Sequence, residues 1–225
     1  FNEMNIKCSK SLNLMAYQYF VYQLVRPYSK IERMLVVHRT GAGKTFTMIM
    51  CLNNFFYDRR DKVIIFPTQP VAQNFYGEIM KFPNLYRDYV IRTLGDDILD
   101  KLNSENRLSS NLARKKVAEV LALTGKLSKA GKSGFPGGPL RTYRYSQNPS
   151  VSDPIFRVNL QTNKNPYNDK IIIMDEVHNL VVPGPEMVRY KKKLMYKADK
   201  FKSCDNSVLL GFTATPFLNK VDEGL

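Results

Sequence analysis

The chain has 225 residues, of which 44% are hydrophobic and 24% charged, a balance typical of a globular domain with a sizeable core. Its net charge of +14 favours polyanionic partners but indicates no particular fold. Cys8, Cys51 and Cys204 form no CxxC pair, and no apolar run reaches the ~18 residues of a membrane span, so we expect an intracellular, reducing location and exclude zinc sites and membrane partners. Because the chain begins at Phe1, without methionine, we expect it to be a fragment of a longer protein.

Short apolar runs that alternate with helical patterns predict the fold. The expected strands are Leu35–Val37, Val63–Phe66, Ile171–Met174 and Val208–Phe212. The expected helices are Thr45–Phe56, Val71–Lys81, Ser109–Leu123 and Glu186–Lys200. Alternation of this kind indicates an α/β domain with a mostly parallel sheet and helices on both faces, and ligands of such sheets bind beyond the carboxyl ends of the strands.

The segment from Met34 to Met50 has the pattern of a phosphate-binding loop. Its strand leads through Thr40-Gly41-Ala42-Gly43 into Lys44-Thr45 and then a helix, so loop and helix N–H groups can point at phosphate oxygens. Glycines at 41 and 43 permit positive φ and close approach of the backbone to the ligand. The lysine would reach the β- and γ-phosphates, and the hydroxyl of Thr45 would ligate Mg²⁺. The strict pattern places a further glycine where this chain has His38, so a second motif is needed.

Two adjacent carboxylates supply that second motif. Asp175 and Glu176 follow the apolar run Ile171–Met174, and His178 comes two residues later. Asp175 would hold Mg²⁺ beside the phosphates, and Glu176 would orient and deprotonate the attacking water. An ordinary polar turn is the alternative, but it does not account for the phosphate loop upstream. We therefore expect an ATP–Mg site.

A third segment, Val208–Pro216, ends a predicted strand with Thr213-Ala214-Thr215-Pro216. Its hydroxyls can hydrogen-bond the turn around His178 and so respond to the bound nucleotide. Taken alone, the same residues also fit a simple turn before a proline.

Two basic segments are candidates for contact with a polyanion. Residues 125–154 are rich in Gly and Pro and hold Arg141 and Arg144, interleaved with Phe135, Tyr143 and Tyr145, and no acid lies between Lys126 and Ser152. We interpret this segment as an insertion without regular structure, either a solvated loop or a nucleic-acid contact in which cations bind phosphates and rings stack on bases. The second segment, residues 189–202, has seven cations and one acid and reads as a cationic helix face; the cations are Arg189, Lys191, Lys192, Lys193, Lys197, Lys200 and Lys202.

The ordered motifs HRTGAGKT, DEVH and TATP resemble the first motor domain of superfamily-two helicases and translocases, a P-loop, RecA-like three-layer fold. The resemblance spans residues 1–225. It implies that ATP and Mg are bound and hydrolysed by Lys44, Thr45, Asp175 and Glu176, while His178, Thr213 and Thr215 couple the site to nucleic acid. By the same resemblance Thr68 and Gln69, after Phe66-Pro67, contact the nucleic-acid backbone. Gln18, with Gln23 as the second choice, reads the adenine edge unless it is an ordinary exposed helical glutamine.

The resemblance also implies partners. DNA or RNA is expected, with DNA favoured, together with a second motor domain that residues 1–225 do not include. Because that domain supplies the arginine finger, we expect this segment alone to hydrolyse ATP poorly. Thr215-Pro216-Phe217-Leu218-Asn219 resembles the Swi/Snf-like branch. His38 and Pro27-Tyr28 are similar to helicase-like ATPases of large cytoplasmic DNA viruses, of the poxvirus early transcription factor and nucleoside triphosphate phosphohydrolase group.

The viral likeness implies RNA polymerase or transcription factor subunits as partners and a cytoplasmic or virion location, with the nucleus as the alternative. Two other classes stay open at this point. A non-catalytic P-loop module that holds nucleic acid or a polymerase would account for the altered start of the loop at His38. A P-loop kinase or transporter-type ATPase would share the loop, but TATP argues against it.

Overall fold

The computed structural model describes residues 14–123, 137–180 and 188–215. The chain divides into two compact units. One comprises Ile31–Lys44, Arg59–Ala72 and Pro139–Leu225; the other comprises Phe1–Lys30, Thr45–Asp58 and Gln73–Gly138. The first unit holds the sheet and the second is helical.

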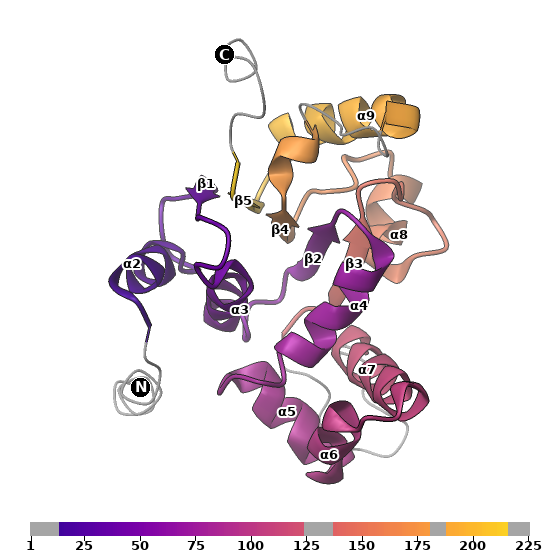
Figure 1. The fold of residues 1–225 in the computed structure, drawn as a ribbon. Helices are drawn as coiled ribbons and strands as arrows, with labels where there is room; N and C mark the ends of the chain where they lie inside the picture. The colour runs from indigo at the N-terminus through magenta and orange to yellow at the C-terminus, as the bar shows by residue number, and fades with distance from the viewer. Residues whose placement is uncertain (1–13, 124–136, 181–187, 216–225) are drawn as a thin grey trace. The chain divides into compact units, whose positions relative to one another are not determined.

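A five-stranded sheet, parallel throughout, has the strand order β1-β5-β4-β2-β3 (Figure 1). Its strands are β1 (Arg33–Val37), β2 (Asp61–Phe66), β3 (Leu140–Arg144), β4 (Lys170–Asp175) and β5 (Val208–Thr213). The four expected strands and the α/β, RecA-like fold are thus confirmed. Val37 lies beside Thr213, and Asp175 beside Phe212, so the three predicted motifs leave the sheet at one edge.

The edge strand β3 corrects the interpretation of residues 125–154. That segment was expected to lack regular structure, yet Leu140 to Arg144 pair in register with Lys62 to Phe66 of β2. A polar, mostly half-buried strand suits a sheet edge, because among the described residues β3 has a neighbouring strand on one side only. The proline at 139 precedes the strand, where its missing N–H costs no ladder hydrogen bond. Residues 125–136 of the predicted insertion lie outside the described residues.

One face of the sheet forms a hydrophobic core with two helices of the same unit. These are α8 (Pro154–Gln161) and α9 (Lys191–Lys202), which follows the 3₁₀ turn η2 (Val188–Tyr190). Alternate strand residues such as Ile65 and Ile172 pack with Phe156 of α8 and with Leu194 and Phe201 of α9. Every residue of β4 and β5 is buried, as expected for strands inside a parallel sheet.

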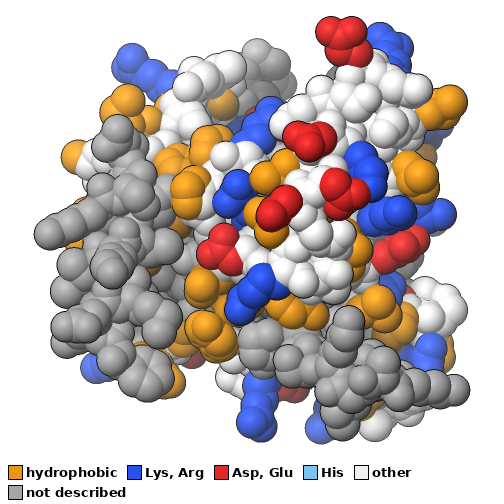
Figure 2. Space-filling model, turned by 90° about the horizontal axis from the view of Figure 1, so that it is seen from below, with side chains coloured by type: hydrophobic (Ala, Val, Ile, Leu, Met, Phe, Trp, Pro, Cys, Tyr) orange, Lys and Arg blue, Asp and Glu red, His pale blue; other side chains and the backbone are white. Residues whose placement is uncertain are grey.

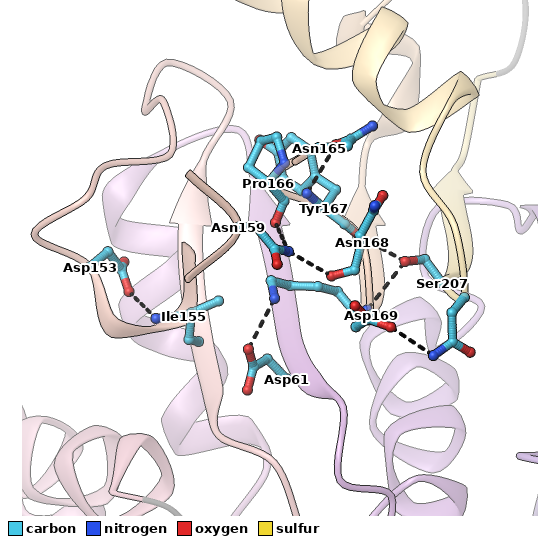
Figure 3. A network of polar contacts seen from close by, with 12 residues as sticks. Asp61, Asp153, Ile155, Asn159, Asn165, Pro166, Tyr167, Asn168, Asp169 and Ser207 are labelled. Carbon is cyan, nitrogen blue, oxygen red and sulfur yellow. Dashed lines mark hydrogen bonds and ion pairs between the residues drawn. The ribbon is translucent and has the colours of Figure 1, made fainter. Parts of the chain in front are cut away.

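Polar contacts fix the amino ends of the strands (Figure 3). The ammonium of Lys170, only 3% exposed, lies 3.0 Å from the carboxylate of Asp61 and so joins the starts of β4 and β2. The Ser207 hydroxyl donates to the carbonyl of Tyr167 and accepts from the Lys170 N–H. Asn159 of α8 donates to the carbonyl of Asn168 at 3.0 Å. The last turn of α8 and the starts of β2, β4 and β5 are thereby tied together, at the side of the sheet opposite the motifs.

The helical unit consists of α2 (Ala16–Leu24), most of α3 (Lys44–Asn54) and α4 (Gln69–Glu78), and all of α5 (Leu85–Leu94), α6 (Asp97–Asn103) and α7 (Arg107–Ala122). Asn84 and Asn106 cap α5 and α7 by accepting N–H groups of the first turn. Asn54 ends α3 and donates to the carbonyls of Tyr22 and Val25 at 2.8 and 2.6 Å, which holds α2 to α3.

Three predicted helices are confirmed as α3, α4 and α7, and each begins within two residues of its predicted start at residue 45, 71 or 109. The helix predicted from Glu186 corresponds to α9, which begins at Lys191. The helices α2, α5, α6 and α8 were not predicted. Asp153 caps α8, and Pro154 is the first residue of that helix. In the sequence Pro154 was interpreted as a residue that interrupts regular structure, although proline is common at the first position of a helix.

The face drawn in Figure 2 carries acidic and basic side chains side by side, with apolar groups between them. The excess positive charge of the chain is therefore not segregated on that face. Within the described residues, no helix has both the length and the apolar character needed to cross a membrane.

Candidate nucleotide-binding site

The loop between β1 and α3 has the backbone of a phosphate cradle. Gly41 and Gly43 have φ of +81° and +73°, conformations that side chains disfavour. A tight turn is closed by the Ala42 N–H, which donates to the Arg39 carbonyl at 3.0 Å. Because α3 begins at Lys44, amides of the loop and the positive end of the helix dipole face the same space. Thr40 and Gly41 are exposed, so the loop is accessible to a ligand.

His38, which replaces the first glycine of the strict motif, is buried. Its N–H donates to the carbonyl of Thr213 at 3.0 Å and so extends the pairing of β1 with β5. Burial lowers the pKa of the imidazole below its ordinary value, and the nearby ammonium of Lys44 lowers it further. A neutral histidine thus stands at the start of the loop.

Lys44 joins the loop to the carboxyl end of β4. Its ammonium lies 3.2 Å from Asp175 Oδ1 and is hydrogen-bonded to Glu176 Oε1. Burial raises the pKa of the Asp175 carboxyl above its ordinary value, while the charge of Lys44 opposes that rise. One cation thereby pairs with two carboxylates at the place where a polyphosphate and a divalent cation would sit.

Glu176 adopts a left-handed backbone, with φ of +50°. This conformation, uncommon for a residue with a side chain, turns the chain from β4 into η1 (Val177–Leu180). Its second carboxylate oxygen accepts from the Thr213 hydroxyl at 3.4 Å and lies 3.4 Å from His178 Nδ1. Glu176 thus contacts Lys44 through one carboxylate oxygen, and Thr213 and His178 through the other.

The Thr213 hydroxyl is the centre of the contact between those two motifs. It lies 2.9 Å from His178 Nδ1 and accepts the N–H of Thr215 at 3.1 Å. Since its single proton goes to Glu176, the contact with His178 requires the imidazole proton on Nδ1. Asn179 Nδ2 lies 3.4 Å from the other ring nitrogen, which matches an acceptor at Nε2. Pro216 lies outside the described residues.

The residues predicted to bind metal are partly assembled. Asp175 offers a carboxylate beside Lys44, and Thr45 is half-buried in the first turn of α3. No group of three or more His, Cys, Asp or Glu in the described part of the chain could hold a metal ion. The donor set nevertheless fits Mg²⁺, which in such sites binds one or two protein oxygens together with substrate phosphates.

Gln18, the candidate for adenine recognition, is buried in α2 rather than exposed. It is 4% exposed, and its Oε1 accepts the N–H of Met15 at 3.0 Å. The alternative of an ordinary exposed glutamine is therefore wrong for this residue. Gln23 of the same helix is half-buried.

The candidate nucleic-acid residues differ in exposure. Thr68 and Gln69 are exposed directly after β2, where α4 begins. Arg141 and Arg144 are half-buried on β3, and an Arg141 guanidinium nitrogen lies 3.7 Å from the Asp153 carboxylate. That ion pair satisfies part of the charge of Arg141 within the chain.

Two predictions about the basic segments are wrong. Tyr145 was proposed as a stacking ring, but it is fully buried and its phenol donates to the carbonyl of Asp175 at 2.9 Å. Lys197 was assigned to a solvated face, but it is 1% exposed and donates to the carbonyls of Tyr145 and Gln147. The remaining cations of α9 are exposed or half-buried.

Gly211 was not among the predicted site residues. An added Cβ there would lie 3.0–3.2 Å from the side chain of Val177, so a glycine on β5 lets η1 pack closely against the strand. Its position two residues before Thr213, inside an otherwise apolar strand, was the available signal.

Comparison with known proteins places this site in a family. The family described as "Type III restriction enzyme, res subunit" matches residues 11–218. No curated protein matches the chain. The crystal structure of the Pyrococcus furiosus Hef helicase domain aligns with 96% of this chain and 36% of its own, at 15% identity and a TM-score of 0.51. The crystal structure of DUF1998 helicase MrfA aligns with 98% of this chain and 30% of its own, at 18% identity and a TM-score of 0.45.

The likeness to the Hef helicase domain concerns the fold, and this chain spans about a third of the length of the solved chains it matches. The match to residues 11–218 covers almost the whole chain and includes all three motifs. The chain therefore belongs to the type III restriction enzyme res-subunit family, a family of helicase-like, superfamily-two ATP-binding domains.

Proposed function

We propose that this chain is the ATP-binding half of an ATP-dependent helicase or translocase that moves on nucleic acid. The observation that carries the proposal is the ion pairing of Lys44 with both Asp175 and Glu176. A phosphate-loop lysine and two adjacent carboxylates at the carboxyl ends of parallel strands make up the set that phosphoryl transfer from ATP requires.

Each residue then has a distinct task. Backbone amides at the end of the loop and the start of α3 bind phosphate oxygens, and Lys44 moves from Glu176 to the β- and γ-phosphates when ATP binds. That movement frees Glu176 Oε1 to accept a proton from water, while Thr213 and His178 hold Oε2 in place. Asp175 and Thr45 would hold Mg²⁺, which neutralises charge on the phosphates.

Coupling to nucleic acid is assigned to the second oxygen of Glu176. His178, Thr213 and Thr215 form one hydrogen-bonded group that touches the proposed general base. A change in the TATP segment on binding nucleic acid would therefore alter the position of Glu176 directly. Thr68, Gln69, Arg141 and Arg144 are the proposed backbone contacts, Gln18 the proposed adenine contact, and a second motor domain the proposed source of an arginine finger.

The finer identity is proposed on sequence likeness. The Swi/Snf-like features favour DNA, and the likeness to helicase-like ATPases of large cytoplasmic DNA viruses favours a role in viral transcription beside RNA polymerase or transcription factor subunits. A comparison of duplex DNA, single-stranded DNA and RNA as activators of ATP hydrolysis tests the substrate class. Stimulation by RNA alone would contradict the DNA assignment.

The second candidate is a non-catalytic module that binds nucleic acid or a polymerase through the same fold. It is favoured by His38, whose buried ring stands where the strict motif has glycine. Lys44→Ala and Glu176→Gln discriminate the two candidates in the full-length protein. A motor loses ATP turnover in both variants. A binding module keeps its nucleic-acid affinity in both variants, and even its wild-type form hydrolyses no ATP.

A further inference from the structure

The buried tyrosine at the end of β3 contacts the proposed catalytic turn. Tyr145 is 0% exposed, and its phenol donates to the backbone carbonyl of Asp175 at 2.9 Å. Burial raises the pKa of this phenol well above its ordinary value, and the carboxylates of Asp175 and Glu176 add to that rise. The hydroxyl therefore keeps its proton and remains a donor at physiological pH.

Tyr145 is itself fixed from two sides. Its N–H donates to the carbonyl of Phe66, the last residue of β2, at 3.2 Å. Its carbonyl accepts a hydrogen bond of 2.9 Å from the ammonium of Lys197 in α9. The same ammonium also donates to the carbonyl of Gln147. The phenol thus projects from a backbone that β2 and α9 hold in place.

The carbonyl that Tyr145 binds belongs to the peptide plane between Asp175 and Glu176. Rotation of this plane changes φ of Glu176, which the structure holds at +50°, a conformation disfavoured for glutamate. A hydrogen bond to the carbonyl therefore constrains the turn that carries both carboxylates, and it fixes the direction of the Cα–Cβ bond of Glu176.

We propose that Tyr145 is a positioning residue for the Asp175–Glu176 turn and that Lys197 holds Tyr145 in register. The proposal rests on the proposed ATPase function only for its kinetic consequence. The conformational consequence, a peptide plane released when the phenol is removed, concerns the fold of this chain alone. Tyr145 touches no reacting atom in this scheme and acts through the two acids.

The test uses Tyr145→Phe, which removes one hydroxyl and keeps the ring in the core. Tyr167→Phe is the matched control, since Tyr167 is 1% exposed in the same hydrophobic cluster. Amide hydrogen exchange of the full-length protein, followed by mass spectrometry over residues 174–179, is the first readout. We expect about tenfold faster exchange in Tyr145→Phe, corresponding to about 1.4 kcal/mol of lost protection, and wild-type exchange in Tyr167→Phe.

Steady-state ATP hydrolysis is the second readout. We expect kcat of Tyr145→Phe to fall about tenfold while KM for ATP stays within about twofold, since the nucleotide loop is untouched. Lys197→Met should produce the same pattern with a smaller loss of kcat, and Lys191→Met, a charge removed from the exposed side of α9, should behave as wild type.

The outcomes separate the two proposals. Wild-type exchange over residues 174–179 in Tyr145→Phe would overturn the positioning role, whatever the ATPase rates. Faster exchange with an unchanged kcat in an active enzyme would also overturn it, because the turn would then not limit turnover. If the wild type hydrolyses no ATP but exchange is still faster in Tyr145→Phe, the proposed motor function is wrong. The proposed support of the turn by Tyr145 would then still hold.

Discussion

The Nδ1 atom of His178 lies 2.9 Å from the hydroxyl oxygen of Thr213, and that hydroxyl also donates to Glu176. Two segments 35 residues apart in sequence thus share one hydroxyl group beside the proposed general base. The two segments therefore depend on each other: removal of the Thr213 hydroxyl or of the His178 imidazole abolishes the hydrogen bond that joins them.

Thr213→Val keeps the shape of the side chain and removes the hydroxyl. We expect nucleic-acid-stimulated kcat to fall about tenfold, since Glu176 loses the donor to Oε2. His178→Asn should cost a similar factor, and the double variant little more than either single one. Steady-state ATPase assays of the full-length protein measure all three.

Thr162→Val, at the exposed end of α8, serves as the control for loss of a threonine hydroxyl. Fully additive losses in the double variant would mean that His178 and Thr213 act independently.

Gly211 permits the close packing of η1 on β5. Gly211→Ala places a Cβ 3.0–3.2 Å from three atoms of Val177, so we expect a loss of about 1–2 kcal/mol in the free energy of unfolding. Combining it with Val177→Ala should cost less than the sum of the two single changes, because the second change removes the clash. Denaturant unfolding of the four proteins gives the coupling.

Gly77→Ala in α4 is the comparison for this change. Its added Cβ would meet the flexible guanidinium of Arg114 at 3.3 Å, and alanine suits a helix better than glycine. A neutral or stabilising effect there, beside a destabilising one at Gly211, fits packing against Val177; equal effects would argue against it.

The ammonium of Lys197 predicts a pH dependence of stability. Burial lowers its pKa from 10.5 to about 8. Between these values the unfolded chain binds more protons than the folded one, so the contribution of Lys197 to stability is largest above pH 10.5 and is lost as the pH falls through about 8. The loss is on the order of 3 kcal/mol.

Denaturant unfolding of wild type, Lys197→Met and Lys191→Met at pH 7 to 10 measures this contribution. We expect stability of the wild type relative to Lys197→Met to rise with pH, and relative to Lys191→Met to stay level. A level difference for Lys197→Met as well would mean that its ammonium keeps an ordinary pKa.

The sequence predicted those parts of the molecule in which local pattern and fold agree. β2, β4 and β5 are buried, β1 is an apolar run that is largely exposed, and the glycine loop, Asp175-Glu176 and the TATP segment each follow one of these strands. Parallel strands place their carboxyl ends on one edge, so the meeting of Lys44 with Asp175 and Glu176 is a consequence of the topology.

The parts not predicted depend on contacts between distant residues. β3 is polar and lies in a Gly- and Pro-rich segment. The sequence therefore contains no apolar run there that would predict a strand paired with β2. Tyr145 and Lys197 look like surface residues among their basic neighbours, and only the tertiary fold buries them beside Asp175. The contact of the Thr213 hydroxyl with the turn around His178, by contrast, was predicted and is confirmed, and the adjacency of β5 and β4 makes it possible.

Lys44, Asp175 and Glu176 are proposed to act together in ATP hydrolysis. Steady-state ATP hydrolysis by the full-length protein with Mg²⁺, with and without DNA, tests this role in wild type, Lys44→Ala and Glu176→Gln. We predict DNA-stimulated turnover that falls by about 100-fold or more in each variant, as expected when a phosphate ligand or a general base is lost. Turnover by the wild type no greater than that of Lys44→Ala, or an undiminished rate in Glu176→Gln, would show that these residues do not hydrolyse ATP.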